Sequence, residues 1–150
     1  MSGDTMIGTD VPDDYEHDMT MVYALMAATE KPLCLSFRKR ENISPALQIF
    51  DLASGGEGAF LNKPSVIFGG CPIVSPLRFG KENLEVMIDA TRLGLVSDIA
   101  VAPQSGATAP ATLAGILAQV VAETLSCLAV VNLIRPGCPV TFATWPFVTD

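Results

Sequence analysis

The stretch from residue 102 to residue 115, APQSGATAPATLAG, places polar side chains directly before a long apolar run. Gln104, Ser105 and Thr108 carry amide and hydroxyl groups, and Gly106 supplies the backbone freedom that a tight turn needs. A loop of this kind before a helix points hydrogen-bond donors at an anion or a polar group, helped by the helix N-terminus. The spacing also allows a purely structural role, in which Gly106 makes the turn and Thr108 caps the helix. The loop is therefore a candidate binding element with a structural alternative.

Further residues with side chains suited to ligand binding occur in two other segments. Arg78 follows Ser75 in a second loop, where it can hold a carboxylate or phosphate by paired hydrogen bonds. Its alternative role is an ion pair with Glu82, four residues later. Trp145 and Phe147 follow an apolar run, where they can form an aromatic wall for a quaternary ammonium group or, as packing favours, lie beneath a neighbour that this chain lacks.

Two titratable residues in helical segments are better explained by structural roles. Glu123 lies in the middle of an apolar run, which favours a buried hydrogen-bonding group over an acid-base catalyst. His17 lies in an acidic amphipathic segment, so we expect it on the surface. The four cysteines show no C-x-x-C spacing and lie far from His17 in the sequence, so we expect no metal site from this chain.

The elements that must position these residues alternate along the chain. Apolar runs of strand length cover residues 33–37, 65–70, 97–102 and 139–144, with a weak strand candidate at residues 5–9. Helical spacing covers residues 14–29, a segment opened by Ser44 and Pro45 and closed at residues 54–56, residues 82–94, and the run after Pro110 that ends at residues 135–137. Residues 71–80 are expected to form a long loop. Continuous apolar strands joined by helices predict a parallel sheet covered on both faces.

Two architectures fit this order: an open doubly wound sheet and a (β/α)8 barrel. Five strand candidates and four helices are roughly half of such a barrel, and the sequence stops just after a strand. The sequence therefore predicts an α/β fold that is a slice of a longer chain, with both architectures open at this point. The expected organisation is an acidic lead-in over residues 1–12 and an α/β domain over residues 13–150. In either architecture ligands bind at the carboxyl ends of the strands, where the candidate side chains fall.

The distribution of charge excludes some classes of partner. Seven acids and no Lys or Arg fall in the first thirty residues, whereas nine acids balance nine bases from residue 31 onward. A nucleic-acid surface needs clustered Lys and Arg, and the short run at residues 38–40 is expected in a solvated loop. No nucleic-acid partner is therefore expected.

The apolar stretch over residues 107–134 is long enough to cross a bilayer. Gln119, Glu123 and Asn132 interrupt it, which favours a helix buried in a soluble protein over a membrane role. The acidic start does not resemble a secretory signal, and scattered cysteines fit a reducing compartment. We therefore expect a cytoplasmic protein.

Several of these segments, taken in order, resemble the trimethylamine methyltransferase family, the corrinoid-dependent methyltransferases that act on methylated amines and betaines. The resemblance runs through SPLRF (residues 75–79), the APQSGATAPATLAG loop, AQVVAE (residues 118–123) and LIRPGCPVTFAT (residues 133–144). Residues 31–57 are consistent with it more loosely. The ordered succession is more specific than any single piece.

The resemblance implies that residues 13–150 form a partial (β/α)8 TIM barrel, roughly half of the barrel, whose C-terminal face receives a methyl donor of the trimethylamine or glycine betaine type. It implies that the methyl group passes to the cobalt of a corrinoid held by a cognate partner protein, with no cofactor bound directly by this chain. Some members carry pyrrolysine, at a position that falls beyond Asp150, so the resemblance assigns no catalytic residue here. The side chains expected to line the face are Ser75, Arg78, Gln104, Ser105, Thr108 and Trp145.

Two alternatives remain open at the level of the sequence. The first is a truncated, non-catalytic barrel remnant that associates with itself through open sheet edges. The second is a phosphate-binding barrel enzyme of another class, such as an aldolase or an isomerase. On the methyltransferase interpretation, these 150 residues alone are expected to show little or no activity.

Overall fold

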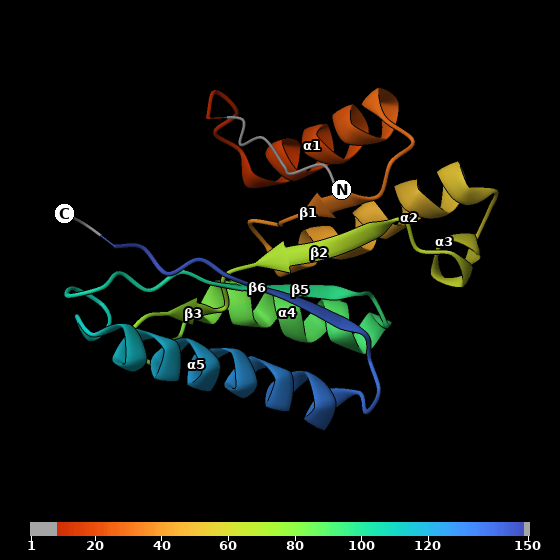
Figure 1. The fold of residues 1–150 in the computed structure, drawn as a ribbon. Helices are drawn as coiled ribbons and strands as arrows, with labels where there is room; N and C mark the ends of the chain where they lie inside the picture. Colours follow the sequence, from red (N-terminus) through yellow and green to blue (C-terminus); the bar gives the residue numbers. More distant parts are fainter. Residues whose placement is uncertain (1–8, 149–150) are drawn as a thin grey trace.

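The computed structural model describes residues 9–148 and has an α/β fold (Figure 1). The elements in chain order are α1 (Asp14–Ala28), β1 (Leu33–Leu35), the 3-10 turn η1 (Arg40–Asn42), α2 (Ile43–Ser54), α3 (Ala59–Asn62), β2 (Val66–Gly70), β3 (Ile73–Val74), β4 (Arg78–Phe79), α4 (Lys81–Leu93), β5 (Ser97–Val101), α5 (Leu113–Ile134) and β6 (Val140–Thr144). The alternation of strand and helix predicted from the periodicity is confirmed over these residues.

Four strands form the main sheet, in the spatial order β1, β2, β5, β6, and every neighbouring pair is parallel. The spatial order therefore follows the chain order. A doubly wound sheet instead reverses its strand order at a switch point, and the described strands show no such reversal. The short strands β3 and β4 pair antiparallel in a separate hairpin.

The helices lie over one face of this sheet. Strand residues with buried side chains on that face are Leu33, Leu35, Val66, Phe68, Ile99 and Val101. They pack with buried apolar residues of α1, α2, α4 and α5, which follow one another around the sheet in chain order (Figure 1). On the opposite face Ile67 and Asp98 are half-buried and Thr141 is exposed, although the small Ala100 is buried. The prediction of helices on both faces is therefore wrong for the described residues.

The boundaries of two helices differ from those predicted. α2 begins at Ile43, so Ser44 lies inside its first turn and is not the N-cap, because the η1 turn runs directly into the helix. α5 begins at Leu113, and the side chain of Thr112 caps it by accepting a hydrogen bond from the Gly115 N–H at 3.2 Å. The predicted cap, Thr108, has another role described below.

Several local features were not predicted or lie at the edge of the described region. The expected loop at residues 71–80 contains the β3–β4 hairpin, and α3 is an additional short helix. The strand candidate at residues 5–9 lies outside the described residues apart from Thr9, which is part of a turn. The division between a lead-in and a domain near residue 13 stays a prediction.

Candidate functional site

The carboxyl ends of β2, β5 and β6 continue into the segments 71–80, 102–112 and 145–148. The last two run side by side, because the Trp145 N–H donates to the Val101 carbonyl at 2.9 Å and the Ser105 N–H donates to the Phe147 carbonyl at 2.8 Å. The Phe147 N–H in turn donates to the Pro103 carbonyl at 3.0 Å. The predicted site residues Ser105 and Trp145 therefore come from adjacent backbone segments.

Thr108 folds the loop at residues 102–112 onto itself. Its hydroxyl oxygen accepts a hydrogen bond from the Gln104 N–H at 2.8 Å, and the Gln104 carbonyl accepts from the Thr108 and Ala109 N–H groups, each at 2.9 Å. Gly106 makes the turn at φ +76°, a conformation that strains residues with a Cβ. The hydroxyl of Ser105 donates to the Ala111 carbonyl at 3.3 Å. The structural alternative for Gly106 is confirmed, and Thr108 closes the loop in place of capping the helix.

Two side chains of α5, the buried carboxylate of Glu123 and the amide of Gln119, hold two loops together. Glu123 is 1% exposed; its Oε2 accepts from the Ser75 hydroxyl at 2.8 Å, and its Oε1 accepts from the Leu77 N–H and the Gln119 side-chain amide, each at 2.9 Å. The same Gln119 amide nitrogen donates to the Thr108 carbonyl at 2.8 Å. We call these five residues the Glu123 clamp. The structural role predicted for Glu123 is confirmed.

Arg78 lies exposed in β4, opposite Val74 in the hairpin, and has no ion pair within residues 9–148. The predicted pair with Glu82 is absent there, because the Glu82 carboxylate lies 3.3 Å from the Lys39 Nζ instead. The preceding residue, Leu77, has φ +53° and is 67% exposed, while its N–H is bound by the clamp. The hairpin therefore presents the Arg78 side chain to solvent together with the apolar side chains of Val74, Leu77 and Phe79.

Trp145 and Phe147 are each 54% exposed. This exposure agrees both with an aromatic wall and with packing beneath a neighbour outside this chain, so both interpretations stay predictions. Gln104, Ser105 and Thr108 are half-buried in the neighbouring loop. The aromatic rings and the polar loop thus lie at the same edge of the sheet, with both rings open to solvent.

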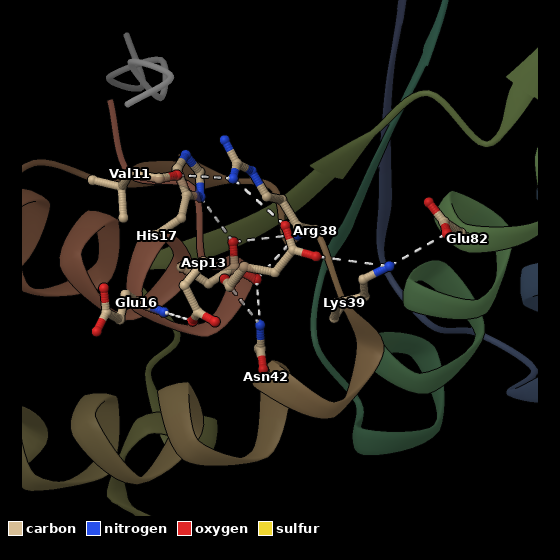
Figure 2. A network of polar contacts seen from close by, with 10 residues as sticks. Val11, Asp13, Glu16, His17, Arg38, Lys39, Asn42 and Glu82 are labelled. Carbon is tan, nitrogen blue, oxygen red and sulfur yellow. Dashed lines mark hydrogen bonds and ion pairs between the residues drawn. The ribbon is translucent and has the colours of Figure 1, made fainter. Parts of the chain in front are cut away.

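A second polar cluster, at the carboxyl end of β1, was missed by sequence analysis (Figure 2). The carboxylate of Asp18, 1% exposed, accepts from the Arg38 N–H at 3.0 and 3.3 Å and from the Asn42 side-chain amide at 2.8 Å. It also lies 3.1 Å from the Nδ1 of His17, which is buried. The surface position predicted for His17 is therefore wrong. The signal for this cluster in the sequence was the four-residue spacing of Asp14 and Asp18, which places both carboxylates on one face of a helix, together with the basic run at residues 38–40.

The basic run at residues 38–40 is tied to α1 and α4 by ion pairs. Asp14 approaches Arg38 and Lys39 at 3.5 and 3.8 Å, and Arg40 Nε lies 2.6 Å from Asp89. The hydrogen bond to Glu82, and then its charge, raise the pKa of Lys39. The solvated loop predicted here is therefore a set of partly exposed ion pairs.

An open hollow of about 370 Å³ lies beside this second cluster. Its lining includes Lys39, Glu82, Ser36 and Asn83, so it carries charges of both signs. Within residues 9–148, no three His, Cys, Asp or Glu side chains lie close enough together to hold a metal ion. The four cysteines are thiols, and burial raises the pKa of Cys127 to about 11.

Comparison with known proteins gives a consistent family. The model of the trimethylamine methyltransferase family matches residues 1–150. A glycine betaine methyltransferase from Desulfitobacterium hafniense (strain Y51) is 28% identical over 151 residues, which cover 100% of this chain and 31% of the relative. The trimethylamine methyltransferase MttB from Desulfitobacterium hafniense (strain DSM 10664 / DCB-2) is 25% identical over 150 residues, covering 98% of this chain and 30% of the relative. The chain spans about a third of the length of these relatives.

Proposed function

Because the chain belongs to the trimethylamine methyltransferase family, we propose that it is part of an enzyme that moves a methyl group from a methylated amine or betaine to a corrinoid on a cognate partner protein. The observation that carries the proposal is the family match over the whole chain. The gathering of the candidate side chains at the carboxyl edge of the sheet supports it, since parallel α/β folds bind their ligands there.

We further propose that the sheet is a segment of a (β/α)8 barrel. Parallel strands in chain order with one layer of helices are the pattern of such a barrel. Phe142 of β6 pairs with Ile99 on the helix-bearing face and is nevertheless 64% exposed. A further helix over this position, within the longer span of the relatives, would bury it.

The chemistry proposed asks mainly for positioning. A corrinoid supplies the cobalt that takes the methyl group, and transfer from nitrogen is an in-line displacement that gains from orientation and exclusion of water. Trp145 and Phe147 offer ring faces for a quaternary ammonium group. The loop residues Gln104 and Ser105 and the clamp hold the adjacent edge in shape.

Substitution of the exposed Arg78 distinguishes the two types of methyl donor. A betaine has a carboxylate that a guanidinium can bind by paired hydrogen bonds, whereas trimethylamine has none. If Arg78 binds this carboxylate, Arg78→Gln raises KM for glycine betaine by about tenfold or more and leaves KM for trimethylamine unchanged.

The test is donor-dependent methylation of a corrinoid protein by the complete enzyme. The reduced corrinoid protein is mixed with enzyme and either trimethylamine or glycine betaine, and the visible spectrum of the corrinoid is followed. We expect methylation with one donor class and none without enzyme. No methylation across a panel of methylated amines and betaines overturns the proposal and favours the non-catalytic remnant.

The phosphate-binding alternative has less support. The first turn of α5 is already capped by Thr112, and the Ser105 and Thr108 hydroxyls are engaged within their own loop. A saturable phosphate titration that protects residues 104–112 would revive it.

A cytoplasmic location is proposed as well. In the described part of the chain α5 is the one helix long and apolar enough to cross a membrane. It packs against α4 and β5, however, and Glu123 near its middle binds the loop at residues 71–80. These contacts support a core helix of a protein outside the membrane, and recovery of the complete protein in a membrane-free extract is the check.

A further inference from the structure

The Glu123 clamp joins two loops that follow different strands. Ser75 and Leu77 belong to the segment after β2, and Thr108 belongs to the loop after β5. Gln119 is the link between them, because one amide nitrogen donates both to Glu123 and to the Thr108 carbonyl. Every contact in this chain of hydrogen bonds is 2.8 or 2.9 Å long.

The carboxylate of Glu123 is matched to its surroundings. An ionised carboxylate only accepts hydrogen bonds, and here three donors converge on it, two from residues 71–80 and one from α5. Since Glu123 is 1% exposed, a donor released from it finds little water as a substitute. A shift of either loop therefore leaves a buried polar group unpaired, which disfavours movement of one loop without the other.

We propose that Glu123 is a positioning residue that couples residues 71–80 and 102–112 into one unit, so that a ligand bound against either loop fixes both. Glu123 does not contact the ligand itself, because its oxygens are taken up by the clamp. The coupling is a property of this chain alone, whereas its value for methyl transfer rests on the function proposed above. An experiment can therefore contradict the methyl-transfer proposal without contradicting the coupling of the two loops.

Substitutions at Glu123 separate hydrogen-bond geometry from charge. In Glu123→Gln, the amide oxygen still accepts from Leu77 and Gln119, and the new amide group donates to the Ser75 oxygen. Glu123→Met keeps the length of the side chain and removes every acceptor. The matched control is Thr124→Val on the next residue, which is also buried and whose hydroxyl has no partner in the described structure.

The measurement is hydrogen exchange of backbone amides in the complete protein without ligand. Glu123→Met should speed exchange about tenfold or more at Leu77 and also at Thr108 and Ala109, since unpaired buried groups destabilise both loops. Glu123→Gln and Thr124→Val should stay within about threefold of the parent protein. Faster exchange confined to residues 75–79, or a Glu123→Gln variant that behaves like Glu123→Met, overturns the proposal.

A milder pair of variants decides the matter if Glu123→Met does not fold. Ser75 lies at the surface end of the clamp, so Ser75→Ala removes a single hydrogen bond. It should speed exchange at Thr108 and Ala109 by about threefold, and this remote effect should vanish in a Gln119→Leu background, where the link is missing. An unchanged Thr108 amide in Ser75→Ala, or the same remote effect without Gln119, overturns the coupling. Failure of the methylation assay would leave these exchange results unaffected.

Discussion

The buried carboxylate of Asp18 gives a test of what holds α1 to the rest of the fold. The Asp18 carboxylate accepts from the Arg38 backbone N–H and the Asn42 amide and lies 3.1 Å from the His17 Nδ1, and the Asn42 amide also donates to the Asp14 carbonyl at 3.3 Å. Asp18→Ala removes this buried acceptor from all three groups, and each hydrogen bond lost at such a site costs about 1–3 kcal/mol. The more favourable helix propensity of alanine offsets about 0.5 kcal/mol of this cost. We expect a loss of about 3 kcal/mol in the free energy of unfolding.

The matched control is Asp14→Ala, one turn earlier on the same helix. Asp14 forms only partly exposed ion pairs at 3.5 and 3.8 Å, which contribute about 0–1 kcal/mol. Both variants gain the same helix propensity, so the difference between them isolates the buried contacts. Urea unfolding followed by far-ultraviolet circular dichroism measures both free energies in the complete protein. Costs within about 1 kcal/mol of each other would refute the reasoning, because burial would then add nothing.

The cap at Gly94, the Lys39–Glu82 pair and the Cys127 thiol each give a separate check. Gly94→Ala should cost about 1–2 kcal/mol, because φ is +81° and a Cβ would meet a guanidinium; an unchanged urea midpoint contradicts this. Lys39 should titrate above its ordinary pKa of 10.5 by NMR, and Glu82→Gln should lower this pKa. Because the folded-state pKa is raised, the pair stabilises at neutral pH and loses its effect as pH rises through that value; equal pKa values in both proteins contradict it. Burial raises the pKa of Cys127 to about 11, so at pH 8 iodoacetamide should label the exposed Cys71 long before Cys127, and equal labelling would contradict this.

The elements could be predicted where a local signal sets them. Asp13 caps α1 by accepting from the Glu16 N–H at 2.9 Å, and the apolar runs at β2 and β5 give buried strands. The ends of α2 and α4 fall at glycines, as the sequence indicated. In each case residues within a few positions of one another decide the outcome, so a pattern along the chain is enough.

The candidate site was harder to predict because distant residues determine it. Thr108 and Thr112 both precede the α5 helix, and only the loop contact with Gln104 shows which one caps. The buried His17 lies beside Asp18, and the Asp18 carboxylate binds Arg38 and Asn42, which are 20 and 24 positions away in the sequence. Pairing between segments so far apart leaves no periodic mark in the sequence.

The order of the strands in the sheet has a consequence for how the polypeptide folds during synthesis. Each strand after β1 pairs with the strand that precedes it in the main sheet. When β2, β5 and β6 emerge from the ribosome, the strand with which each one pairs has therefore already been synthesised. No strand has to wait for a later one in order to be inserted between two neighbours. Translation and folding can thus advance in the same direction, and a pause leaves the most recent strand as an open edge that is exposed to aggregation.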